Sequence, residues 1–123
     1  MVQFSDLVGK TLKNVYQSHD NKYGDDEIVF VTDDDKTYRL YHSQDCCESV
    51  NIEDIVGDLK DLVDTPILDA EEASNSEDDP GDRYAESYTW TYYKLRTIKG
   101  SVDIRWFGSS NGYYSERVSF GEV

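Results

Sequence analysis

The sequence predicts an α+β domain, in which one amphipathic helix packs on an antiparallel sheet of about six or seven strands. Three observations predict this class. Short runs of β-branched and aromatic residues recur along the chain, separated by turn-forming residues. Apolar residues between 52 and 63 recur at the spacing of a helix. Ten of the 16 aromatic residues are Tyr, and rings of this kind supply much of the buried area in a small protein. At 123 residues, the chain 1–123 is expected to form one domain.

The first forty residues predict an entry turn followed by three strands. Phe4, Leu7 and Val8 are expected to pack their side chains at this turn. Residues 11–18 read as a strand, and residues 19–26 read as a polar loop rich in turn formers. Residues 27–32 and 37–42 alternate in polarity on either side of a four-residue polar turn, so they predict an antiparallel hairpin.

The helix is predicted over residues 52–63. Asn51 can cap its start, and Pro66 ends the pattern. Gly57 inside the pattern could allow another backbone to come close. The apolar face consists of Ile52, Ile55, Val56, Leu59, Leu62 and Val63. The opposite face would present Glu53, Asp54, Asp58, Asp61 and Asp64 to solvent.

The second half of the chain predicts more strands. Residues 67–73 fit either a strand or a short helix, and a strand is favoured. Residues 75–86 predict a flexible acidic loop rich in Asp, Ser, Pro and Gly. Residues 87–97, 102–107 and 113–120 predict a three-stranded meander, whose second turn contains Asn111 and Gly112.

The acidic residues are concentrated in the middle of the chain. The net charge is -14, which disfavours the compact state through self-repulsion. Solubility, a salt-rich habitat and attraction to a basic surface are all compatible with it, whereas direct binding to nucleic acid is not expected. An acidic surface for a basic partner would use the residues of the expected helix and of the segment after it: Asp54, Asp58, Asp61, Asp64, Glu71, Glu72, Glu77, Asp78, Asp79 and Asp82.

The C-terminal meander offers an alternative site. It is mildly basic and aromatic, and arginine beside aromatic rings is suited to clamping a phosphate and stacking on a base. A nucleotide site would use Arg105, Trp106, Asn111, Tyr113 and Arg117, at the interface of a homo-oligomer such as a homodimer. The alternative is that one face of the meander is core and that its arginines pair with acidic residues on the other face.

A third and less favoured site combines His42, Cys46 and Cys47. These are ligand and nucleophile types, but one short cluster lacks the paired spacing of a zinc site. No nucleophile elbow or phosphate-binding loop is visible. We therefore expect a binding protein without catalytic residues, metal or cofactor. Residues 1–15 lack a signal-peptide core and no run is long enough to span a membrane, so we expect free thiols and a cytosolic protein.

Two motifs resemble a family of short, uncharacterised proteins from bacteriophages and prophages. They are the QDCCE motif at residues 44–48, followed by the segment IEDIVGDLKDL, and the RWxGxSNGYYSE motif at residues 105–116. The resemblance implies a phage setting, the cytoplasm of the host bacterium and an accessory role. Small acidic phage proteins often antagonise host immunity, by analogy of class. We therefore expect an inhibitor of the anti-CRISPR or anti-defence type that binds a basic, nucleic-acid-handling host protein, and a sponge for nucleotide signals is the alternative.

Overall fold

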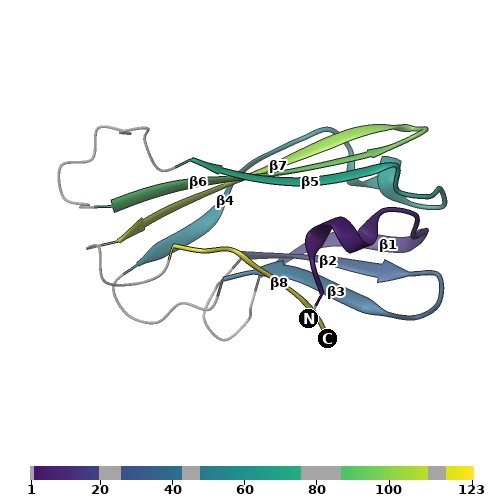
Figure 1. Cartoon of the computed structure of the whole chain (residues 1–123), viewed down its shortest axis with the longest axis horizontal. Coiled ribbons are helices and arrows are strands. Elements are labelled where there is room, and N and C mark those ends of the chain that lie inside the picture. The colour runs from purple at the N-terminus through teal and green to yellow at the C-terminus, as the bar shows by residue number, and fades with distance from the viewer. Residues whose placement is uncertain (1, 20–25, 43–47, 76–86, 111–115) are drawn as a thin grey trace.

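The structure, a computed structural model, describes residues 2–19, 26–42, 48–75, 87–110 and 116–123. The first sheet has the order β1-β2-β3-β8, with β1 (Leu12–His19), β2 (Asp26–Thr32), β3 (Thr37–Tyr41) and β8 (Ser119–Glu122). The second has the order β4-β7-β6-β5, with β4 (Ser49–Val56), β7 (Gly100–Ser110), β6 (Ser87–Thr97) and β5 (Asp69–Asn75). All neighbouring strands are antiparallel. Figure 1 shows the two sheets as facing layers.

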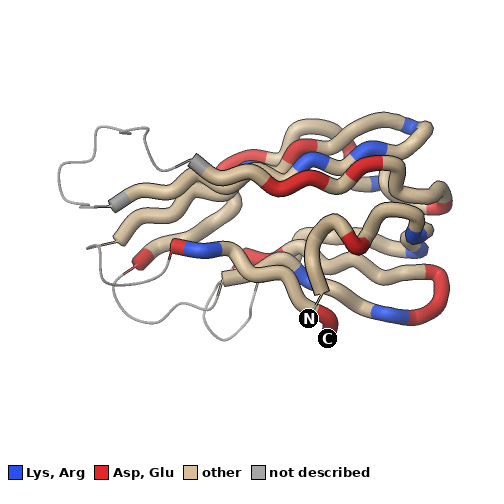
Figure 2. The backbone as a smooth tube through the Cα atoms, in the orientation of Figure 1, with Lys and Arg blue, Asp and Glu red and all other residues tan. Residues whose placement is uncertain are grey.

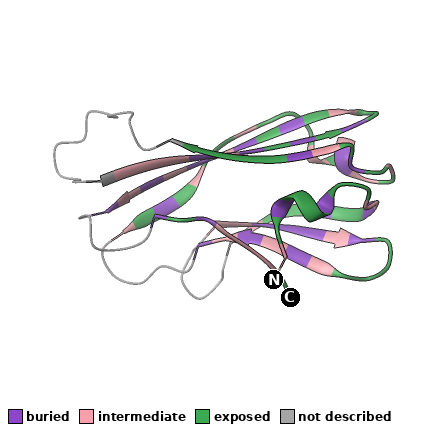
Figure 3. Ribbon diagram, viewed as in Figure 1, coloured by how far each residue is buried: buried purple, intermediate pink, exposed green. Residues whose placement is uncertain are grey.

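The core lies between the two sheets. Phe30 and Leu40 of the first sheet belong to the same buried cluster as Tyr93, Ile104 and Trp106 of the second. The buried positions alternate along the strands, as expected where one face of each sheet is covered (Figure 3). The expectation of one sheet with a helix packed on it is therefore wrong, because the second sheet occupies the place expected for the helix.

No α-helix occurs in the described part of the chain, so the predicted helix over residues 52–63 is wrong. Residues up to Val56 form the edge strand β4, and η2 (Leu59–Leu62) is a single 3-10 turn. Val50 is buried and Ile52 and Ile55 are half-buried, so all three contribute to the inner face of β4. A bulge between Ile52 and Asp54 inserts an extra residue between the last two. The inward residues of a strand recur at every second position, and the bulge lengthens the interval between Ile52 and Ile55 to three. That interval resembles the spacing of a helix face.

Gly57 turns the chain from β4 toward η2. Its φ of +108° belongs to the region that favours glycine. A Cβ atom added at this position would lie 2.5 Å from the carbonyl oxygen of Ser101 on β7. The prediction that Gly57 allows another backbone to approach is confirmed, although the element that contains it is not a helix.

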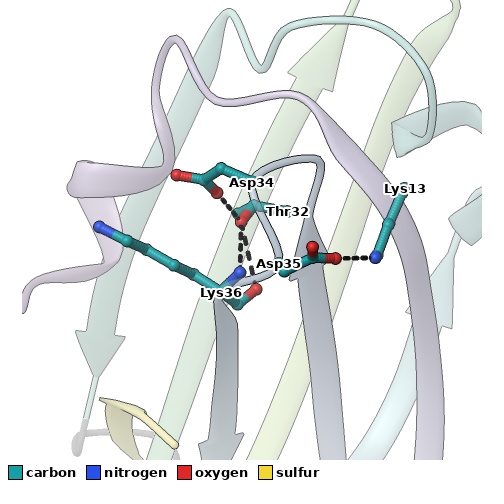
Figure 4. Close-up of polar contacts among 5 residues, drawn as sticks. All are labelled: Lys13, Thr32, Asp34, Asp35 and Lys36. Carbon is teal, nitrogen blue, oxygen red and sulfur yellow. Dashed lines mark hydrogen bonds and ion pairs between the residues drawn. The ribbon is translucent and has the colours of Figure 1, made fainter.

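The predicted hairpin of β2 and β3 is confirmed, and so is the strand at β1. The turn between β2 and β3 is stabilised by polar contacts at the end of the sheet (Figure 4). The Thr32 hydroxyl accepts a hydrogen bond from the backbone N–H of Lys36 at 3.1 Å and donates one to the carboxylate of Asp34, which lowers the pKa of Asp34. Asp35 has a φ of +66° and pairs with Lys13 of β1.

The strands β5 and β6 and the hairpin of β6 and β7 are confirmed, but the third strand of the meander is wrong. After β7 the chain crosses to the other layer, where β8 pairs with β3. The predicted turn at Asn111 and Gly112 lies outside the described residues, as do residues 20–25 of the predicted loop 19–26 and residues 76–86 of the predicted loop 75–86. The ends of these two loops that are described belong to strands, with His19 in β1, Asp26 in β2 and Asn75 in β5. At the N-terminus, η1 (Phe4–Leu7) buries Phe4 and Leu7 as predicted, whereas Val8 is exposed.

Candidate functional site

The predicted acidic residues do not share one face. Asp54 lies on β4, at one edge of the second sheet, and Glu71 and Glu72 lie on β5, at the other edge. Two strands separate these edges, which places them about 14 Å apart. Figure 2 shows acidic residues distributed over both sheets and their turns. The single acidic helical face is thus wrong, because its scaffold is a strand and a turn.

Three of the predicted acids shape the connection between β4 and β5. Asp58 caps η2, where its carboxylate accepts a hydrogen bond from the backbone N–H of Lys60 at 2.9 Å. The carbonyl oxygen of Asp61 accepts a hydrogen bond from the Thr97 hydroxyl at 2.5 Å. Asp64 has a φ of +68° and its N–H donates to the Leu12 carbonyl at 2.8 Å. These contacts show that the three residues stabilise the connection between β4 and β5. Four other predicted acids lie outside the described residues: Glu77, Asp78, Asp79 and Asp82.

Glu71 and Glu72 lie exposed on the edge strand β5, as Asp54 does on β4 at the opposite edge. The side chains of residues 71–74 are all exposed, and β5 pairs only with β6 in the described part of the chain. Strand alternation points Glu71 to the outer face of the sheet and Glu72 to the inner side, in register with Lys94 and Tyr93 of β6. The acidic residues of β5 therefore meet solvent on both sides of an open edge.

A groove with a volume of about 1100 Å³ runs beside this edge. It is lined by residues of β5 and β6, of the N-terminal segment with η1, and of the segment that leads into β8. Phe4 and Phe120 contribute apolar surface, while Glu72 and Arg117 contribute charge. The groove therefore lies where the two sheets part at their edges, and it combines an apolar lining with both signs of charge.

The buried hydroxyl of Tyr93 has no hydrogen-bond partner among the described residues. Tyr93 is fully buried, and its ring meets the Phe4 ring edge-on with centroids 4.8 Å apart. Burial is the main cause that raises the pKa of this hydroxyl, and the nearby Glu72 carboxylate raises it further, while Arg117 opposes both. The hydroxyl thus stays protonated and retains an unused hydrogen-bond donor.

The predicted nucleotide-site residues are not brought together. Trp106 is 1% exposed and belongs to the core, whereas Arg105 lies on the outer face of β7 and pairs with Glu53 and more distantly with Asp54. Arg117 lines the groove near β5. Asn111 and Tyr113 lie outside the described residues.

A neighbouring aromatic cluster was missed. Trp90 and Phe107 lie with ring centroids 4.6 Å apart, Tyr88 stacks on Phe107 at 6.2 Å, and the Arg105 guanidinium lies 5.5 Å from the Trp90 ring. All four side chains are partly exposed on the outer face of the second sheet. The signal was the alternation within SYTWTYYKLRT, which places Tyr88, Trp90 and Tyr92 on one face.

His42 belongs to a buried polar cluster at the end of β3. Its Nδ1 lies 2.7 Å from the Arg117 carbonyl oxygen and its Nε2 lies 3.1 Å from a carboxylate oxygen of Glu48. Because both ring nitrogens are engaged, neither is available as a metal ligand or a catalytic base in this arrangement. Cys46 and Cys47 lie outside the described residues. Within the described part of the chain, no group of three or more His, Cys, Asp or Glu side chains is placed to hold a metal ion.

Glu116 forms a second buried polar contact that the sequence did not indicate. Its carboxylate accepts hydrogen bonds at 2.6 Å from the hydroxyls of Thr89 and Ser110. These bonds join β6 and β7 to the segment that crosses to the first sheet. Together with the His42 cluster they indicate a structural role for Glu48 and Glu116, the last residue of each sequence motif.

None of the helices described is long and apolar enough to cross a membrane.

Comparison with known proteins places the chain in a family. No curated protein and no solved structure matches the chain. Residues 5–120 match the family described as a domain of unknown function, DUF7448. This match covers most of the sequence, and it is consistent with the resemblance to an uncharacterised family. The chain belongs to the DUF7448 family.

Proposed function

We propose that this protein is a non-enzymatic binder that attaches to a basic surface of another protein. The biological role that we propose is a phage-encoded antagonist of bacterial immunity, with a nucleic-acid-handling host protein as the partner. The resemblance of the two sequence motifs to phage and prophage proteins supports the setting. The net charge of -14 supports the sign of the partner, because opposite charge speeds encounter and selects among partners.

The observation that carries this proposal is the exposed acidic edge of β5. Glu71 and Glu72 are exposed there, and the adjoining groove offers a recess with apolar and charged walls. A basic partner could therefore combine ion pairing with burial of apolar surface. The His42 cluster is buried, and the exposed acids Asp58 and Asp64 do not line this groove.

Capture from bacterial lysate tests the proposal. Immobilised wild-type protein should retain basic, nucleic-acid-binding proteins that elute between about 0.1 and 0.5 M salt, because screening weakens exposed charge pairs. Glu71→Lys should reduce the yield. Asp54→Lys, which makes the same change of charge on the opposite edge, should reduce it less. Retention that is indifferent to salt and to both variants would contradict the proposal.

The biological role needs a separate assay. Expression of the wild-type protein in bacteria that restrict an incoming phage by a nuclease system should raise the efficiency of plating. Glu71→Lys should lose that effect more than Asp54→Lys. If neither the wild type nor Asp54→Lys changes plating on any strain with such a system, the antagonist role is wrong, even if the protein binds basic surfaces.

A second candidate function is binding of a ring-shaped ligand on the cluster of Tyr88, Trp90 and Phe107. Exposed rings on a sheet face can stack on bases or on other flat rings. The charge of Arg105 is already compensated by Glu53, so a phosphate would have to compete for it. Fluorescence titration of the two tryptophans with cyclic and adenine nucleotides, and with neutral sugars, would test this function. Unchanged emission with every ligand would remove it.

A further inference from the structure

We infer that β5 accepts an extended basic segment of the partner, which adds to the open edge as a fifth strand of the second sheet. The inference rests on the proposed function and specifies how the partner is held. It names the occupant by its chemistry: a stretch of extended chain that presents Lys or Arg on the outer face of the sheet. The contact would run along residues 71–74 and continue into the groove.

The backbone of β5 provides the first argument. Within the described chain β5 forms ladder hydrogen bonds with β6 alone, and no other backbone group bonds residues 69–75. In an antiparallel ladder, about half of the N–H and C=O groups of an edge strand point away from its neighbour. The four exposed residues 71–74 therefore present unpaired donors and acceptors at the spacing of a strand.

The register across the sheet determines which charge the side chains of an added strand should carry. On the outer face, Glu71 lies opposite Lys94, and Lys94 lies opposite Asp103. Two residues along the strands, Asp69 lies opposite Arg96, whose Nε–H donates a hydrogen bond to the Asp69 carboxylate at 2.9 Å. Charges thus alternate from strand to strand and end on acids at the open edge. Because opposite charges on neighbouring strands stabilise a sheet, the next position is suited to Lys or Arg.

The groove side accommodates the alternate residues of the same segment. Side chains that point inward from an added strand would lie beside Glu72 and Ser74, above an apolar wall that includes Phe4 and Val118. A short side chain that carries both a methyl and a hydroxyl group, such as threonine, suits these inward positions.

A second copy of this chain is a poor occupant. Antiparallel pairing of two β5 edges about a two-fold axis would bring Glu71 and Glu72 of one copy close to the same residues of the other. Like charges on paired strands are destabilising, and charged edges discourage the pairing of identical sheets. The acids of β5 therefore select against self-association and in favour of a basic segment.

Binding of defined peptides tests the inference. The probe is a fluorescent peptide of about ten residues with alternating lysine and threonine, followed by anisotropy at about 0.05 M salt. A second peptide has the same sequence with every backbone nitrogen methylated, so it keeps its charges and loses its N–H donors. The protein variants are Glu71→Lys and the matched Asp54→Lys, each checked for the wild-type circular dichroism spectrum and melting temperature.

Strand addition predicts that the methylated peptide binds at least about tenfold more weakly than the unmethylated one, because the ladder hydrogen bonds are lost. It also predicts that Glu71→Lys weakens binding of the unmethylated peptide at least about fivefold, while Asp54→Lys weakens it less than about twofold. Equal binding of the two peptides, with equal effects of the two variants, would overturn strand addition and leave a purely electrostatic binder. Absence of binding by either peptide would overturn the inference, and the lysate capture would then decide separately whether the protein binds basic surfaces. Sedimentation as a dimer that the peptide dissociates would also overturn it, because β5 would then be occupied by a second copy.

Discussion

At the scale of single residues, the roles of three positions, Gly57, Tyr92 and Tyr93, do not follow from their side-chain types alone. Gly57 was recognisable in the sequence as a site of close approach, since glycine interrupted an apolar pattern. Its partner, the Ser101 carbonyl on β7, could not be predicted, because that contact depends on the strand order. Tyr92 and Tyr93 are identical neighbours, yet one lines the groove and the other is fully buried. Only the register of β6 separates their roles.

Gly57→Ala is expected to destabilise the fold more than Gly9→Ala. Both glycines have positive φ, +108° and +86°, so both substitutions incur backbone strain of about 1 kcal/mol. Only at Gly57 does the added Cβ meet another backbone, at 2.5 Å, whereas nothing lies within 4 Å at Gly9. We expect Gly57→Ala to lower the free energy of unfolding by about 3 kcal/mol in urea titrations. Equal losses in the two variants would show that the close approach to Ser101 is absent.

Tyr93→Phe is expected to raise the free energy of unfolding by about 1 kcal/mol at neutral pH, because it removes a buried hydroxyl without a partner. The pH dependence provides a second readout. The pKa of Tyr93 is raised in the folded state above the ordinary value of 10.0, so above that pH the unfolded chain releases a proton that the folded chain retains. Wild-type stability should therefore fall by up to about 1.4 kcal/mol per pH unit above pH 10 through this residue, and Tyr93→Phe should lack that part. Identical pH profiles of urea denaturation for the two proteins would contradict the burial of the hydroxyl.

At the scale of elements, the hairpin of β2 and β3 and the hairpin of β6 and β7 were predictable, because each couples alternating residues to a short polar turn. The element at residues 49–62 was not. A bulged strand, a glycine bend and one 3-10 turn reproduce the spacing of a helix face. Local spacing cannot separate the two structures, and the contacts of β4 with β7 decide between them.

Deletion of Glu53 is expected to be tolerated better than deletion of Asn51. Without Glu53, the inward residues Val50, Ile52 and Ile55 would follow one another at every second position, and the bulge would disappear. Without Asn51, Val50 and Ile52 would become neighbours and point to opposite faces. We expect deletion of Glu53 to cost about 1 kcal/mol in urea titrations, including its pairing with Arg105, and deletion of Asn51 to cost about 3 kcal/mol. The reverse order would contradict the bulge at this position.

At the scale of the whole molecule, the sequence indicated the β-rich character but not the pairing of two sheets. Residues 67–73 and the two hairpins each identify a strand or a pair, but the order β4-β7-β6-β5 joins segments that are distant in the chain. The crossing of the chain to β8 likewise depends on packing between the layers. The candidate site, too, was predictable from the sequence only in part. Composition identified Glu71 and Glu72 among many acids, while their position on an open edge beside a groove required the fold.

The central claim is that this acidic protein holds a basic partner along β5. The most direct measurement is amide NMR of the isotopically labelled protein during titration with the alternating lysine and threonine peptide. We predict that resonances of residues 71–74 shift and that their outward-facing amides exchange more slowly with solvent, because they enter a new ladder. Residues 51–54 on the opposite edge should change little. Shifts centred on β4, or spread evenly over all exposed acids without protection at β5, would contradict the claim.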